Sequence, residues 1–305
     1  MKEKIIFLTG PTAIGKTQVA IQLAKKINAE IISCDSMQVY KGMEVISSQP
    51  QASLRKIIPH HLLGVIRASK EYNVSAYRRN ALKNIEEVIK KGRTPLFVGG
   101  TGLYISIVID GIFKVKAEDA ALRQRLYKEA AERGSQFLYD QLLKVDAEAA
   151  AKIHPHDTRR IVRALEVYEI TGKPISLLQK QRKGITDKYD IAVFCLDMPR
   201  DKLYKRIDER VEKMFRQGLI NEVKQLLKRR LSKTAAAAIG IRELKGYFDN
   251  LYTLEEAKIR IKKNSRNYAK RQLTWFRKDK RIRWIRISGE DSPGAIARRI
   301  YAELK

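Results

Sequence analysis

Short apolar runs alternate along the chain with longer segments in which apolar side chains recur at helical spacing. The runs predict buried strands at 5–8, 30–36, 96–98, 189–196 and 283–287. Segments 16–27 and 75–91 repeat hydrophobic residues every three to four positions, which is typical of amphipathic helices packed on a sheet. Strands that alternate with helices in this way favour an α/β fold, a parallel sheet flanked by helices.

The pattern between residues 115 and 185 is helical throughout. The periodicity there predicts helices at 118–133, 135–145, 146–152 and 158–171. The last of these has clear end signals: Asp157 as its N-cap, Gly172 at its carboxyl end and Pro174 beyond. We therefore expect an all-helical insertion domain.

The α/β pattern resumes after this helical stretch, so the insertion is expected to interrupt one sheet. The predicted division is a helical domain at 115–189 and a core made of 1–114 and 190–305. Further helices are predicted at 200–230, 240–248, 254–278 and 293–304. The stretch 38–64, with Pro50 and Pro59, has the character of an irregular loop.

Gly10–Thr17 reads GPTAIGKT and fits the pattern G-x-x-x-x-G-K-[ST] between a predicted strand and a predicted helix. Glycines let the backbone curl so that its N–H groups converge on phosphates at a helix N-terminus. Lys16 supplies a positive charge, and the Thr17 hydroxyl is placed to reach Mg²⁺. The fold is thus expected to resemble that of P-loop NTPases, although the motif does not identify the phosphorylated ligand.

The chain is strongly basic, with 62 Lys and Arg against 34 Asp and Glu in 305 residues and a formal net charge of +28. Between residues 258 and 286 the count is 13 basic side chains against one acidic. Such an excess indicates either a solvated basic face or a polyanionic partner. The aromatic residues interleaved with it favour nucleic acid, although they are equally compatible with a core: Tyr268, Trp275, Phe276 and Trp284.

Several residue types limit the function classes. Cys34 and Cys195 lie in apolar runs and are predicted to be free buried thiols of a reducing compartment. The phosphate-loop strand begins within a few residues of Met1, and no apolar run is long enough to cross a bilayer. A cytoplasmic protein without a membrane partner is expected. The four histidines lack the spacing of a zinc site.

Polar residues at two further predicted strand ends point to chemistry beside the phosphate loop. Asp35 follows the second strand, and Thr101 follows the strand 96–98 within a glycine-rich turn. Ligands of open α/β sheets bind at the carboxyl ends of strands, so Asp35 is a candidate base that the Thr101 hydroxyl could orient. The strand 96–98 ends in glycines and lacks the acidic residue that helps P-loop NTPases to hold Mg²⁺, which weakens the case for ATP hydrolysis.

Taken together, these motifs resemble the bacterial tRNA dimethylallyltransferase family, also called tRNA isopentenylpyrophosphate transferases. The matching segments follow the family order over nearly the whole chain. They are Gly10–Thr17, Asp35–Met43, Pro59–Leu62, Val98–Tyr104, Lys152–Pro174, Met214–Leu219, Ala238–Leu244 and Tyr268–Arg277.

The resemblance implies a P-loop core with a helical insertion and a prenyl transfer reaction. The phosphate loop would hold the diphosphate of dimethylallyl diphosphate with Mg²⁺. The dimethylallyl group would move to N6 of the adenosine on the 3′ side of the anticodon in tRNA. The expected partners are tRNA, bound through its anticodon stem-loop, and dimethylallyl diphosphate; we expect the chain to act as a monomer.

The resemblance also implies roles for individual residues. Asp35 would be the general base, and Thr101 would position it by a hydrogen bond. Diphosphate-binding residues would be Gly10, Pro11, Thr12, Ala13, Ile14, Gly15, Lys16, Thr17 and Arg210, with Thr17 also at the metal. Residues expected to contact tRNA are Asp35, Ser36, Met37, Gln38, Thr101, Arg123, Arg159, Arg160, Ile161, Val162 and Arg163.

The chain departs from the family pattern in two places. Family members usually carry G-T-A-K-P where this chain has Ile46–Pro50, so a lysine expected near the substrates is absent. The usual H-P-N-D appears as His154–Asp157 with a second histidine. Because Asp35, Thr101 and the phosphate loop are intact, activity is expected to survive.

Three other functions fit parts of the sequence. One is prenyl transfer to a free adenine nucleotide, and another is a small-molecule kinase on the same P-loop core. The third is a non-catalytic RNA-binding protein that retains a phosphate loop. The basic excess and the helical insertion favour a polymeric acceptor over a free nucleotide. Phosphoryl transfer from ATP would support the kinase, and tight tRNA binding without a prenylated product would support the RNA-binding protein.

Overall fold

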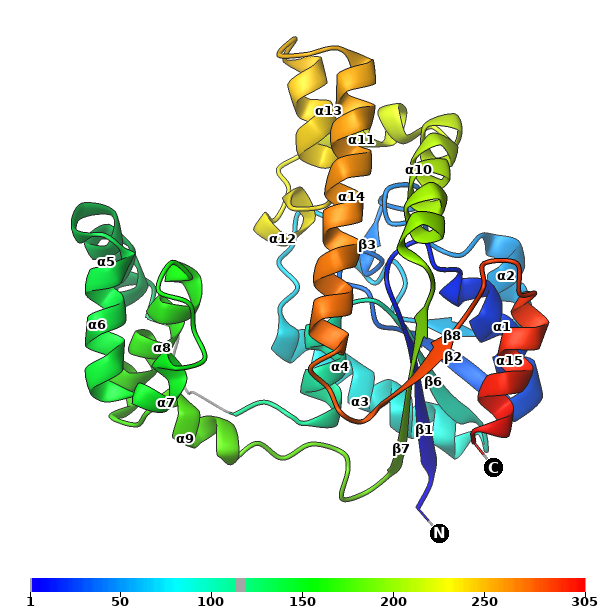
Figure 1. Ribbon diagram of the computed structural model, residues 1–305, viewed down its shortest axis with the longest axis horizontal. Coiled ribbons are helices and arrows are strands. Elements are labelled where there is room, and N and C mark those ends of the chain that lie inside the picture. The colour runs from blue at the N-terminus through cyan, green and yellow to red at the C-terminus, as the bar shows by residue number, and fades with distance from the viewer. Residues whose placement is uncertain (1, 114–118, 305) are drawn as a thin grey trace. The chain divides into compact units, whose positions relative to one another are not determined.

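The computed structural model describes residues 2–113 and 119–304. It divides the chain into two compact units, one formed by 1–109 with 186–305 and the other by 110–185 (Figure 1). The sequence placed the helical insertion at 115–189, so the second unit begins and ends a few residues earlier. The predicted boundary at 114–115 and the predicted helix start at 118 lie outside the described residues.

A six-stranded sheet in the order β4-β2-β6-β1-β7-β8 forms the centre of the first unit. All of its strand pairs are parallel, and the α/β fold class predicted from the sequence is confirmed. In the middle, Leu8 of β1 pairs with Val98 of β6 and Phe194 of β7. The strands are β1 (Lys4–Thr9), β2 (Ala29–Ser33), β4 (His60–His61), β6 (Thr94–Gly99), β7 (Asp190–Asp197) and β8 (Ile282–Arg286).

Helices cover both faces of this sheet (Figure 1). Helices α1 and α15 pack together on one face, and α3 and α4 lie on the other. Their bounds are α1 (Lys16–Ile27), α3 (Val74–Lys90), α4 (Gly102–Ile109) and α15 (Pro293–Ala302). Strands β1, β2 and β6 are almost fully buried, and the rings of Phe7 and Phe97 stack with centroids 4.6 Å apart.

Further helices of the first unit gather beyond one end of the sheet (Figure 1). They are α10 (Arg200–Arg216), α11 (Leu219–Leu227), α12 (Lys233–Ala236), α13 (Ile241–Phe248) and α14 (Leu254–Phe276). The single helix predicted at 200–230 is wrong. Gly218 has a left-handed φ of 93° and separates α10 from α11, because glycine accepts that conformation without steric cost.

The prediction of an irregular loop over 38–64 is wrong in part. It contains a short helix, α2 (Ala52–Ile57), and the edge strand β4. Another short strand, β3 (Tyr40–Lys41), pairs with β5 (Ile66–Arg67) in a separate two-stranded sheet. Strands of two residues are too short to leave a hydrophobic period in the sequence.

The second unit is a bundle of helices with its own core. Its helices are α5 (Ala120–Arg133), α6 (Ser135–Val145), α7 (Ala147–Ala150), α8 (Thr158–Thr171) and α9 (Ile175–Lys180). The caps predicted for α8 are confirmed, since the Asp157 carboxylate accepts from the Arg160 backbone N–H and Gly172 is left-handed. Helix α9, which directly follows Pro174, lies in the stretch expected to be helical but was not among the four helices predicted there. No helix in the described part of the chain is long and apolar enough to cross a membrane.

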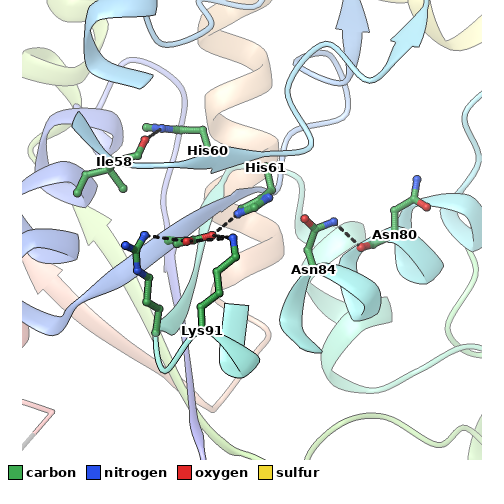
Figure 2. Close-up of polar contacts among 8 residues, drawn as sticks. Ile58, His60, His61, Asn80, Asn84 and Lys91 are labelled. Carbon is green, nitrogen blue, oxygen red and sulfur yellow. Dashed lines mark hydrogen bonds and ion pairs between the residues drawn. The ribbon is translucent and has the colours of Figure 1, made fainter. Parts of the chain in front are cut away.

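A buried carboxylate fastens the edge strand β4 to the sheet (Figure 2). Glu30 of β2 is 1% exposed and accepts from His61 Nε2 at 2.6 Å, Arg93 Nη1 at 2.8 Å and Lys91 Nζ at 3.2 Å. Burial alone would raise the pKa of Glu30, but the hydrogen bonds from His61 and Lys91 outweigh it and hold the pKa below 4.5. His61, one of the four histidines, therefore has a structural role.

Glu30→Gln is expected to lower the free energy of unfolding by about 1–2 kcal/mol at pH 7. The loss stays moderate because Lys91 and Arg93 remain 52% and 40% exposed and can hydrate. A depressed pKa means that this contribution is complete above pH 4.5 and shrinks as the pH falls below it. Urea unfolding of both proteins at several pH values measures the difference. Glu87→Gln, at an exposed helix pair with Lys83, is the control and should change stability by less than about 0.5 kcal/mol.

Candidate functional site

The phosphate loop joins β1 to α1 at the carboxyl edge of the sheet. Gly10 and Gly15 have φ values of 146° and 98°, and Ala13 also has a positive φ of 65°. These conformations curl the loop before α1 begins at Lys16. A Cβ on Gly10 would lie 3.0 Å from the Leu196 carbonyl oxygen, so the close approach of β7 also requires glycine there. The strand-loop-helix context predicted for the motif is confirmed.

Two cations beside this loop have no carboxylate partner among the residues that the structure describes. Lys16 Nζ donates to the carbonyl oxygens of Gly10 and Pro11 at 2.9 and 2.8 Å, and burial lowers its pKa to about 8. Arg210 of α10 donates from Nε to Ser48 Oγ at 3.0 Å and from Nη1 to Thr12 Oγ1. Within the described residues neither side chain forms an ion pair, although burial also lowers the pKa of Arg210. Desolvated positive charges without partners indicate a site for an anion.

Asp35 lies immediately beyond β2, on the same sheet edge. Its Oδ1 accepts a hydrogen bond from the Met37 backbone N–H at 2.9 Å. Thr101 Oγ1 accepts from the Ser36 backbone N–H at 3.0 Å, and the Thr101 N–H donates to the Cys34 carbonyl at 3.1 Å. Thr101 is therefore hydrogen-bonded to the backbone of Cys34 and of Ser36, on both sides of Asp35. The hydrogen bond predicted to the carboxylate itself is not among the contacts of the described residues.

Two side chains of α14 reach this edge and were not predicted as site residues. The Gln272 amide accepts from the Thr12 N–H at 2.9 Å and donates to the Gly100 carbonyl at 2.8 Å, so it bridges the phosphate loop and the turn after β6. Burial raises the pKa of Tyr268 to about 12, assisted by the charge of Asp35 and opposed by a hydrogen bond with Thr101. The sequence signals for them were the family-like segment Tyr268–Arg277 and, for Tyr268, its place among the aromatic residues of the basic stretch.

Two cavities meet at Asp35. The larger, of about 1070 Å³, is lined by the phosphate loop and by Gln38; the smaller, of about 230 Å³, is lined by Ser36 and Met37. Both are bordered by Thr12, Asp35, Ser47, Arg210, Met214 and Tyr268. The carboxylate of Asp35, the guanidinium of Arg210 and the phenol of Tyr268 thus lie where a ligand in one cavity would meet a ligand in the other.

The structure distributes the predicted phosphate-loop residues unequally. The larger cavity is lined by Thr12, Ala13, Gly15, Lys16, Thr17 and Arg210. Gly10, Pro11 and Ile14 are buried behind it, and Ile14 packs in the hydrophobic core. Thr101 lines neither cavity in the described part of the chain, so it acts on the site through the backbone beside Asp35.

The predicted tRNA-contact segment of the second unit needs a correction. Ile161 and Val162 are 0% and 1% exposed in the core of that unit, so their side chains cannot reach a ligand. Helical periodicity explains this, because the apolar face of α8 turns inward. Arg123 and Arg163 both bind the buried carboxylate of Glu166, at 2.9 and 2.8 Å.

The remaining arginines of that segment lie on the surface. Arg159 and Arg160 are exposed at the start of α8, and Arg160 forms an ion pair of 3.3 Å with its N-cap Asp157. Both guanidinium groups are therefore in a position to meet phosphates. The departure at His156 also lies on the surface, where its N–H donates to His154 Nδ1 at 3.2 Å.

The departure at Ile46–Pro50 lies directly on the larger cavity. Gln49, where the family pattern has lysine, donates its amide to the carbonyls of Gln38 and Tyr40 at 3.0 and 3.2 Å. These hydrogen bonds hold the segment in place, and the neutral amide of Gln49 adds no charge to the cavity. Ser48, where the pattern has alanine, contacts Arg210.

The chain is similar to proteins of one family over almost its full length. Residues 38–279 match the family model described as IPP transferase. The tRNA dimethylallyltransferase of Carboxydothermus hydrogenoformans is 46% identical over 99% of this chain and 98% of its own length. That of Halothermothrix orenii is 43% identical over 99% and 91%.

The chain belongs to the IPP transferase family.

Solved structures of family members agree. The full-length tRNA isopentenylpyrophosphate transferase of Bacillus halodurans is 39% identical and superposes with a TM-score of 0.73, over 99% of this chain and 97% of that one. A eukaryotic dimethylallyltransferase acting on tRNA is 31% identical with a TM-score of 0.79, over 94% of this chain and 74% of that chain. The resemblance stated from the sequence motifs is confirmed.

Lys16 gives the site a testable pH dependence. The ammonium form binds an anion, so affinity for inorganic diphosphate is expected to fall as the pH rises through about 8. At pH 9 this amounts to about a tenfold loss, since one pH unit above a pKa leaves about a tenth of the cation. Calorimetric titration between pH 7 and 9.5 measures it. Lys16→Arg keeps its positive charge over this pH range, so its binding curve reports only the titration of diphosphate itself. Identical pH curves for the two proteins would contradict the assignment of Lys16.

Proposed function

We propose that this IPP transferase family member moves a dimethylallyl group from dimethylallyl diphosphate to N6 of the adenosine on the 3′ side of the anticodon in tRNA. The C1–O bond of the donor breaks and an N6–C1 bond forms. The N6 proton passes to a base, and diphosphate leaves. The observation that carries the proposal is the position of Asp35 at the junction of two cavities, the larger of them lined by two cations that form no ion pair with the described residues.

The larger cavity suits the diphosphate of the donor. Lys16 and Arg210 would neutralise the charge that develops on the leaving group as the C1–O bond lengthens. Both are held by neutral oxygens, so bringing in an anion costs no existing ion pair. The N-terminus of α1 adds backbone N–H groups to the same position.

Magnesium fits this cavity as a partner of the diphosphate. Thr17 and Asp35, whose side chains carry oxygen atoms, both line the cavity. The described residues hold no group of three or more His, Cys, Asp or Glu side chains that could bind a metal alone, which suits an ion carried largely by phosphate and water. When bound, Mg²⁺ would offset negative charge on the leaving diphosphate.

The acceptor adenine is assigned to the side of Asp35 that Ser36 and Met37 line. The Asp35 carboxylate would take the N6 proton as the new bond forms. Its orientation is set by the hydrogen bond from the Met37 N–H and by the hydrogen bond from the adjacent Ser36 N–H to Thr101 Oγ1. The target base must leave the anticodon-loop stack to reach this depth, which single-stranded RNA loops allow at modest cost.

Basic side chains on the surface would bind the phosphates of the tRNA backbone. The exposed Arg159 and Arg160 belong to the second unit. Seven of the 13 basic residues between 258 and 286 belong to α14, which also carries Tyr268 and Gln272 into the site. A long acceptor carries phosphates beyond the reacting base for such basic surfaces to bind. A free adenine nucleotide would use neither. A kinase is disfavoured because β6 ends in glycines at the position of the usual acidic residue.

The proposal is tested by a transfer assay with purified protein, Mg²⁺ and radiolabelled dimethylallyl diphosphate. The acceptors are unmodified tRNA with adenosine beside the anticodon, the same tRNA with guanosine there, and free AMP. Label is expected in the adenosine tRNA alone. Label in AMP would favour the mononucleotide alternative, and label in none would contradict prenyl transfer.

Asp35→Asn tests the assignment of the base. It is expected to lower kcat about 10²- to 10⁴-fold, the usual contribution of a general base, while changing the affinity for tRNA little. Single-turnover kinetics measure the chemical step, and filter binding measures the tRNA Kd. Cys34→Ser, which alters the buried neighbouring residue, serves as the matched control. A chemical step equally fast in Asp35→Asn and the wild type would remove Asp35 from the mechanism.

A further inference from the structure

The segment Met43–Gln49 is held against the larger cavity by two helices. Glu222 of α11 accepts from the backbone N–H groups of Val45 and Ile46, each at 2.8 Å. Arg210 of α10 donates to the hydroxyl of Ser48 at 3.0 Å. The segment is therefore fixed at its middle and near its end, and its final residues lie beside the phosphate loop.

Ser48 is built to present its oxygen in one direction. Its φ of 49° is left-handed, and its backbone N–H donates to the Val45 carbonyl at 2.9 Å. The hydroxyl lies 3.5 Å from the same carbonyl, which leaves its oxygen lone pairs for Arg210. A tight local turn thus sets the position of this hydroxyl.

Arg210 is held at two nitrogens by uncharged acceptors. Its Nε is bound by Ser48 and its Nη1 by Thr12 of the phosphate loop. Two separate anchors fix the plane of a guanidinium group, whereas one would leave it free to rotate. In the described part of the chain Nη2 takes part in no hydrogen bond or ion pair, and the side chain lines both cavities. The charge is thus oriented and not neutralised.

We propose that Ser48 is a positioning residue that pre-orients Arg210 for the diphosphate of the donor. The inference rests on the proposed function only in naming that diphosphate. Ordering a long side chain before the ligand arrives removes an entropic cost from binding. Family members usually carry alanine at this place, so the hydroxyl is a feature of this chain within the Ile46–Pro50 departure.

Ser48→Ala is the direct test. It is expected to raise KM for dimethylallyl diphosphate and Kd for inorganic diphosphate by about tenfold, the scale of a hydrogen bond to a charged group. KM for tRNA should stay unchanged, which separates positioning of Arg210 from a general loss of structure. Ser48→Gly removes the same hydroxyl at a left-handed position that glycine accepts freely, so it keeps the test valid if the alanine variant folds poorly.

A double-mutant cycle with Arg210→Lys isolates the pair. Lysine keeps the charge and removes Nε, so adding Ser48→Ala to Arg210→Lys should weaken diphosphate binding no further. The control is Ser47→Ala, which removes a neighbouring hydroxyl bonded to the Met43 carbonyl at 2.5 Å and is expected to act additively with Arg210→Lys. Additive effects of Ser48→Ala and Arg210→Lys would overturn the proposal.

The two proposals can fail separately. If the wild type binds diphosphate but transfers no prenyl group, the proposed function is wrong, and the binding cycle still decides the role of Ser48. If the wild type transfers the prenyl group while Ser48→Ala and Ser48→Gly match it in KM and Kd, only the positioning role is wrong.

Discussion

Two desolvated positive charges at the carboxyl edge of a parallel sheet are the constraint on which the site depends. In the part of the chain that the structure describes, Lys16 and Arg210 form hydrogen bonds to neutral oxygens and no ion pair, so the cavity around them favours a ligand that brings negative charge. Parallel pairing places the phosphate loop after β1, Asp35 after β2 and the glycine-rich turn after β6 at the same edge. The carboxylate that would receive a proton is thereby set beside the group that would leave.

Helix α14 connects this edge to the basic carboxyl-terminal part of the chain. Gln272 joins the phosphate loop to the turn after β6, and Tyr268 forms a hydrogen bond with Thr101 and is influenced by the charge of Asp35. Gly100 and Gly102 have no room for a side chain, because a Cβ would lie 2.1 Å from the Gln272 amide and 2.2 Å from the Trp275 ring. The glycine-rich turn is thus shaped by close packing of α14. A helix that carries many cations is packed directly on the reacting centre.

Much of this arrangement could be predicted from the sequence, because its signals are local. The phosphate loop, the strands of the main sheet apart from β4, and the caps of α8 each follow from a few consecutive residues. The Gln272 bridge could not be predicted, since it joins residues 260 positions apart. The strand β4 was missed because it has only two residues. The break between α10 and α11 was missed because a single residue, Gly218, makes it. The burial of Ile161 and Val162 was readable from helical periodicity and was overlooked.

The central claim is that a phosphate loop here serves transfer of carbon and not of phosphorus. Dimethylallyl diphosphate carrying ¹⁸O at the oxygen that bridges C1 and phosphorus tests it most directly. After reaction with unmodified tRNA, ³¹P nuclear magnetic resonance of the released diphosphate locates the label. Cleavage of the C1–O bond predicts that all of the ¹⁸O leaves with the diphosphate. Diphosphate without the label, with ¹⁸O in dimethylallyl alcohol, would mean attack at phosphorus and would contradict the account.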